Sequence, residues 1–138
     1  MKTINAFILF TEPQLAQKTV EELKQSELIN NIYLLSTRND QDAIDGTQLV
    51  QIDSIQSTET IKKIAELSDS DYTLIYQKST VLQLGYFALE RAINIANDSK
   101  AGLIYSDYYA ITDGKKSAHP VIDYQEGSLR DDFNFGAL

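Results

Sequence analysis

Residues 72–109 constrain the fold of this chain most, because they predict a strand, a loop, a helix and a second strand in succession. Tyr72–Tyr76 is a short run of aromatic and branched residues, which is typical of a buried strand. Apolar residues then recur at the helical spacing i, i+3, i+4 and i+7 at Leu89, Ala92, Ile93 and Ala96. Residues 101–105 return to a strand pattern. A crossover of this length predicts two parallel strands joined by a right-handed connection.

Polar residues follow both of these expected strands. Gln77, Lys78 and Ser79 come directly after the first strand, and Ser106 and Asp107 come after the second. In open parallel sheets, ligands bind beyond the carboxyl ends of the strands. We therefore expect the two polar segments to lie at one edge and to open into a shared pocket that can hold a pyrophosphate.

The first part of the chain predicts a βαβ unit. Residues 4–10 are nearly continuously apolar, as in a strand that is covered on both faces, and residues 32–35 form a second such run after an Asn30-Asn31 turn. A helix is expected between them, with Thr11 as its N-cap and Gln14 at the capping-box position. The inward stripe of this helix comprises Ala16, Thr19, Val20 and Leu23.

Further elements follow a polar loop over residues 36–46. Residues 49–52 predict a short third strand, and Ser57 is a suitable N-cap for a helix that follows. The inner face expected for that helix comprises Ile61, Ile64 and Ala65. Near the end of the chain, the dipeptide Asp113-Gly114 between two strand-like runs indicates a β-hairpin.

Length and charge narrow the class of protein. A chain of 138 residues is about one domain with a real core. The net charge of −8 argues against a nucleic-acid backbone or an anionic lipid surface as the main partner. Zero cysteines exclude disulfides and cysteine-ligated metal sites. No apolar run reaches the ~20 residues of a transmembrane span, and a signal-peptide pattern is lacking, so we expect a cytoplasmic protein.

Two passages resemble the family 2 glycosyltransferases, bacterial enzymes with a GT-A fold that build cell-surface polysaccharides. One is YTLIYQKSTVLQLGYFALERAINIA (residues 72–96), and the other is AGLIYSDYYAITDG (residues 101–114). The resemblance implies a GT-A-like α/β fold: a mostly parallel sheet with helices on both faces and a β-hairpin near the C-terminus. It also implies that residues 1–138 are the N-terminal, donor-binding part of a larger domain. The acceptor half and the catalytic base of the family would then follow residue 138.

The sequence departs from the family at the metal site. The family ends its fourth strand with an Asp-x-Asp motif that holds Mn²⁺ or Mg²⁺ against the donor diphosphate, whose developing charge must be neutralised. Here those positions are Gln77, Lys78 and Ser79, so the usual metal ligands are absent. One hypothesis is that the Lys78 ammonium replaces the metal as a point charge. The alternative is an ordinary exposed lysine on a loop.

The remaining candidates each have two interpretations. Asp107 can accept hydrogen bonds from ribose hydroxyls or simply precede the hairpin, and Asp53 can contact the base or ribose or form the turn before a helix. Thr11 and Ser79 are diphosphate-binding candidates because they follow strands. His119, the only histidine, is expected to be structural or solvated and not catalytic, because no paired carboxylate or serine pattern supports a triad. Arg130 is expected to be solvated.

The function expected from the sequence is transfer of a sugar from a nucleotide-diphosphate sugar to a glycan or a lipid-linked acceptor. This chain would supply the donor-binding part, with no catalytic residue assigned. The alternative is a non-catalytic GT-A-like binding or assembly module that has lost the metal site. A homo-oligomer also remains open, because a third strand as short as residues 49–52 can pair with a second copy if it lies at a sheet edge.

Overall fold

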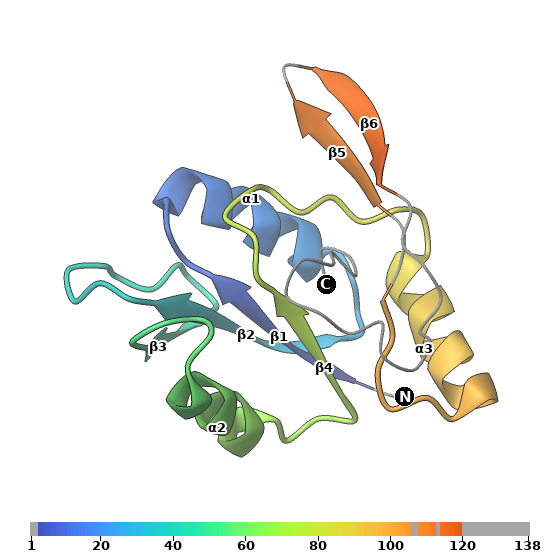
Figure 1. The fold of residues 1–138 in the computed structure, drawn as a ribbon, viewed down its shortest axis with the longest axis horizontal. Helices are drawn as coiled ribbons and strands as arrows, with labels where there is room; N and C mark the ends of the chain where they lie inside the picture. Colours follow the sequence, from blue (N-terminus) through green and yellow to red (C-terminus); the bar gives the residue numbers. More distant parts are fainter. Residues whose placement is uncertain (1–2, 106–107, 113, 120–138) are drawn as a thin grey trace.

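The computed structural model describes residues 3–105, 108–112 and 114–119. Four parallel strands form the central sheet in the order β3-β2-β1-β4 (Figure 1). Their bounds are β1 Ile4–Leu9, β2 Ile29–Ser36, β3 Gln48–Gln51 and β4 Tyr72–Tyr76. The predicted α/β class with a parallel sheet is therefore confirmed.

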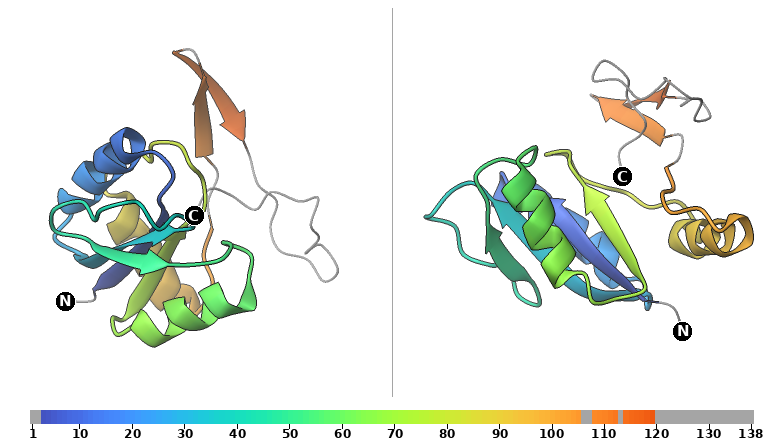
Figure 2. Two further views of the ribbon diagram at one scale, coloured as in Figure 1. Left: turned by 90° about the vertical axis from the view of Figure 1, so that its left-hand side faces the viewer. Right: turned by 60° about the horizontal axis from the view of Figure 1, so that its bottom comes forward.

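Helices cover both faces of the sheet, as predicted. α1 (Pro13–Lys24) and α3 (Ala88–Ser99) contribute Val20, Leu23 and Leu89 to one core cluster, which includes Ile8 and Leu34 from the strands. α2 (Thr58–Leu67) contributes Ile64 to a second cluster on the opposite face, where the Phe7 and Tyr33 rings stack with centroids 4.7 Å apart. In the left-hand view of Figure 2, α1 and α2 lie on opposite sides of the sheet.

The buried face of α1 is the predicted one. Ala16, Thr19, Val20 and Leu23 are all buried, because a helical period of 3.6 places them in one stripe. The predicted cap of this helix is wrong, however. The N-cap residue is Glu12, not Thr11, and its side chain makes no capping hydrogen bond. Pro13 begins the helix, where its missing N–H removes one of the donors that would otherwise need a partner.

α2 confirms its predicted cap, but of its predicted inner face only Ile64 is buried. The Ser57 hydroxyl accepts a hydrogen bond from the Thr60 backbone N–H at 3.2 Å, as an N-cap does. Ile61 is 59% exposed and Ala65 is also exposed, whereas Thr60 is fully buried. The Thr60 hydroxyl donates to the Ser54 carbonyl, which satisfies this polar group inside the core.

The second strand is longer than predicted. Asn30 and Asn31, expected to form a turn, lie within β2. Both side-chain amides donate to the Asn5 side-chain oxygen on β1, at 3.3 and 3.4 Å, so these turn-forming residues are held in a strand by a neighbouring strand.

Residues 101–105 do not form the predicted fifth strand. They follow α3 with no regular structure and are exposed or half-buried, so β4 is an edge strand of the described sheet. The predicted hairpin is present: β5 (Tyr108–Thr112) and β6 (Lys115–His119) pair antiparallel as a separate two-stranded sheet. No helix within the described residues is both long and apolar enough to cross a membrane.

Candidate functional site

The strand order creates a switch point between β1 and β4. The chain proceeds from β1 outward to β2 and β3, then crosses back over β1 to form β4. Ile8 near the end of β1 pairs with Tyr76 at the end of β4, so the loops after the two strands leave the sheet side by side. Ligands of open α/β sheets bind beyond the carboxyl ends of the strands at such a point.

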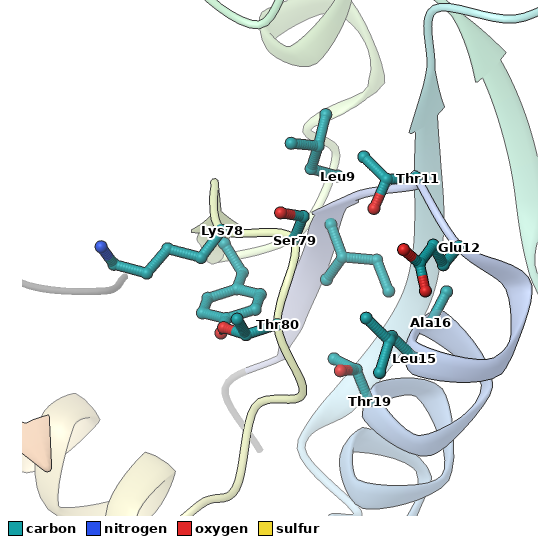
Figure 3. A pocket seen from close by; sticks show the side chains of 11 residues that line it. Leu9, Thr11, Glu12, Leu15, Ala16, Thr19, Lys78, Ser79 and Thr80 are labelled. Atoms are coloured by element: carbon teal, nitrogen blue, oxygen red, sulfur yellow. The ribbon is translucent and has the colours of Figure 1, made fainter. Parts of the chain in front are cut away.

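A small pocket lies at this switch point (Figure 3). The end of β1, the first turns of α1 and the loop after β4 surround it. Its polar lining comes mainly from Thr11, Glu12, Thr19, Ser79 and Thr80. Its volume is about 10 Å³, which leaves room for about one water molecule.

The structure brings together three of the five residues predicted to bind the diphosphate. Thr11, Lys78 and Ser79 all line this pocket. Asp53 does not line it: this exposed residue follows β3, at the other side of the sheet. Asp107, the predicted partner of Lys78 in a shared pocket, lies outside the described residues.

The Lys78 side chain is half-buried, and its ammonium points away from the other lining residues (Figure 3). The flexible four-carbon stem of a lysine permits other directions of the ammonium from the same backbone position. In the conformation seen here, the polar groups that face the pocket are therefore hydroxyls and the carboxylate of Glu12.

Sequence analysis missed Glu12 and Thr80. Glu12 was overlooked because Thr11 was expected to cap α1, although a residue directly before Pro13 at the end of a strand is itself well placed for an edge site. Thr80 follows the predicted Lys78-Ser79 pair, and its hydroxyl forms a hydrogen bond with the Tyr76 hydroxyl at 2.8 Å. That bond ties the loop back to the end of β4.

Hydrogen bonds through Gln41 connect the loop that carries Thr11 to the end of β2. The Gln41 side-chain amide donates to the Thr11 carbonyl at 3.0 Å, and its oxygen accepts a hydrogen bond from the buried Ser36 hydroxyl at the end of β2. These bonds connect the ends of β1 and β2. They give Ser36 a structural role at the end of β2.

The loop after β4 is attached to α1. We call residues 80–84 the strap; Figure 1 shows the chain after β4 passing along α1 before it reaches α3. The Leu82 backbone N–H donates to the Thr19 hydroxyl at 3.1 Å, and the Leu84 N–H donates to a Glu22 carboxylate oxygen at 2.9 Å. The Leu82 side chain is buried in the core beside α1.

The lining of this pocket offers polar groups that can bind a ligand. Within residues 3–105, 108–112 and 114–119, no three His, Cys, Asp or Glu side chains are grouped so that they could hold a metal ion. Threonine and serine hydroxyls, one carboxylate and a lysine within reach can bind a polar ligand.

A second hollow lies beside the edge strand β3 and is larger and more open, at about 410 Å³. Its lining combines β3 with Tyr33 of β2 and with Lys63, Glu66 and Leu67 of α2. The pKa of the Tyr33 hydroxyl is raised, mainly by burial and to a smaller extent by the nearby Asp69 carboxylate, so this phenol stays protonated. This hollow contains none of the predicted site residues.

Comparison of the chain with protein-family models, with curated protein sequences and with solved structures finds no match.

Proposed function

We propose that this chain is the donor-binding part of a glycosyltransferase with a GT-A-like fold. The enzyme would transfer a sugar from a nucleotide-diphosphate sugar to a glycan or a lipid-linked acceptor in cell-surface polysaccharide synthesis. The chain would bind the diphosphate at the switch point, through Thr11 and the segment that follows β4.

One observation carries this proposal: Thr11, Lys78 and Ser79 line one pocket between the carboxyl ends of β1 and β4. They come from loops that are 67 residues apart in the sequence, from Thr11 to Lys78. Their meeting follows from the order β3-β2-β1-β4, which puts β4 against β1. Two arguments therefore support this pocket as the diphosphate site. Ligands of parallel sheets bind at this edge, and the residues that line the pocket carry hydroxyl and ammonium groups that can bind a phosphate.

Binding a diphosphate requires two local changes. A pocket of about 10 Å³ must widen, because it holds about one water molecule. The Lys78 ammonium must also turn toward the pocket, where it would compensate ligand charge in place of the missing metal carboxylates. The Glu12 carboxylate would repel a metal-free diphosphate. It could instead help to coordinate a Mg²⁺ ion that is already bound to the phosphates, because one carboxylate is sufficient for such a site.

The second candidate is a non-catalytic module that uses a GT-A-like scaffold for binding or assembly. The absence of a metal-holding group within the described part of the chain, together with the small size of the pocket, favours this candidate. Under this alternative, the polar residues at the switch point would bind no nucleotide.

Thermal-shift titration of the chain with UDP, GDP and dTDP, each with and without Mn²⁺, separates the two candidates. A ligand at 100 times its Kd stabilises the folded state by about 2.7 kcal/mol, which is easily measured in a domain of this size. Stabilisation by any of these nucleotides supports donor binding. No stabilisation by millimolar concentrations of all three would reject donor binding and favour the module.

A further inference from the structure

We propose that the strap, residues 80–84, is a closure over the switch-point pocket, and that Thr19 and Glu22 of α1 hold it shut. Release of the strap would open the pocket for a diphosphate. The closure itself is argued from contacts in this structure, and only the identity of the ligand rests on the proposed function.

The strap is attached to α1 by two hydrogen bonds of different character. The Thr19 hydroxyl, on a side chain that is only 2% exposed, accepts from the Leu82 N–H in a buried position. The half-buried Glu22 carboxylate accepts from the Leu84 N–H, one helical turn further along α1. Both acceptors are side chains, so the strap can leave without breaking the backbone hydrogen bonds of the sheet or of α1.

The strap and the pocket share their walls. Thr19 lines the pocket and also accepts the Leu82 bond, while Thr80 lines the pocket and begins the strap. The buried Leu82 side chain adds an apolar contact beside α1. α1 forms one wall of the pocket, and the opposite wall ends at Thr80, the first residue of the strap, so movement of the strap away from α1 would widen the pocket at Thr80.

The position of Glu22 lets one substitution test the closure. Glu22→Leu removes the acceptor of the Leu84 N–H from a half-buried surface site, so folding should survive. Glu21→Leu is the matched control: it removes the same charge from the adjacent residue, whose carboxylate accepts from Gln17 within α1. Glu22→Gln removes the charge but keeps an oxygen acceptor, so it should behave like the wild type.

The first measurement reports opening without any nucleotide. Ala16 is buried and lines the pocket, and the chain contains no cysteine, so Ala16→Cys introduces one thiol at that place. When Glu22→Leu is combined with Ala16→Cys, we expect the introduced thiol to react with iodoacetamide about fivefold faster. Loss of one hydrogen bond of ordinary net strength changes the equilibrium between closed and open states by about this factor. Glu21→Leu should leave the rate unchanged. Equal rates in the two variants would overturn the closure, and Thr19→Val, compared with Thr19→Ser, repeats the test at the other bond.

The second measurement is the affinity for inorganic pyrophosphate, determined by calorimetry in variants that keep the native Ala16. We expect Glu22→Leu to bind about fivefold more tightly than the wild type and than Glu21→Leu. Weaker or unchanged binding in Glu22→Leu, with a wild type that binds, would overturn the claim that the strap limits ligand entry. Faster thiol reaction with no binding of pyrophosphate, UDP, GDP or dTDP by any variant would reject the proposed function and support the closure alone.

Discussion

The side-chain amide of Asn5 donates a hydrogen bond to a carboxylate oxygen of Asp69 at 2.6 Å, although 64 residues separate them in the sequence. Asn5 is fully buried on β1, and Asp69 lies in the connection between α2 and β4. The same amide also donates to the Leu67 carbonyl at 3.1 Å, and the Asn5 oxygen accepts from the Ser70 hydroxyl at 2.8 Å. One buried side chain thus fixes the entry of β4 beside β1.

We expect Asn5→Ala to lower the free energy of unfolding by about 2–3 kcal/mol, because several part-buried hydrogen bonds to this side chain are lost together. Urea denaturation monitored by circular dichroism measures this loss. Asn31→Ala is the control: it removes only a 3.4 Å contact to Asn5 and should cost less than about 1 kcal/mol. Equal losses in the two variants would contradict a central role for Asn5.

The N-cap of α2 provides a second stability test. We expect Ser57→Ala to cost about 1 kcal/mol, since the Thr60 N–H loses its acceptor at the start of the helix. Thr11→Ala is the matched comparison, because Thr11 precedes α1 but is not its cap. It should change the urea midpoint little. A comparable loss at Thr11 would show that the two helix starts are stabilised alike.

Lys78 tests the charge assigned to the pocket. We expect Lys78→Ala to weaken binding of UDP or GDP in metal-free buffer about tenfold, because one cation near a diphosphate contributes about 1–2 kcal/mol at a partly exposed site. Calorimetry at low and at moderate salt measures the loss, which should shrink as salt screens the charge. Lys18→Ala, on the exposed face of α1, controls for net charge. Unchanged affinity in Lys78→Ala would exclude its role as a metal substitute.

The Arg38–Asp40 pair predicts a small pH effect. The Arg38 guanidinium hydrogen-bonds the Asp40 carboxylate at 2.8 Å and lowers the pKa of that carboxyl below its usual 3.8. A lowered pKa in the folded state stabilises the fold above pH 3.8, and this stabilisation is lost as the pH falls through the lowered value. Asp40→Asn should therefore melt slightly below the wild type at neutral pH, and the two should converge at strongly acidic pH. Both side chains are mostly exposed, so the ion pair should be weak. A large difference in melting temperature between Asp40→Asn and the wild type at neutral pH would contradict this.

Elements whose structure depends on local pattern could be predicted from the sequence. The buried stripe of α1 and the Ser57 cap follow from helical period and from the chemistry of helix starts. The four parallel strands follow from apolar runs that alternate with helices. Thr11, Lys78 and Ser79 could be named as candidates because each follows a predicted strand, but their grouping at one pocket depends on the strand order that puts β4 beside β1.

Features that depend on distant partners could not be predicted. Asn30 and Asn31 favour turns locally, yet they lie in β2 because Asn5 accepts their amides. Residues 101–105 have a strand composition, but composition does not supply the neighbouring strand on which a sheet depends. The bond from Leu84 to Glu22 arises only from the path of the strap over α1, and a glutamate on a helix gives no sign of such a bond.

The Lys63 ammonium occupies a backbone acceptor on the outer edge of β3. The Ile52 N–H donates to the Ser36 carbonyl on β2, so the backbone of the preceding residue, Gln51, faces outward. Lys63 of α2 reaches over and donates to that outward Gln51 carbonyl at 2.6 Å, which takes it away from any incoming strand. A short edge strand with one outward carbonyl already bonded offers fewer backbone groups to a second strand.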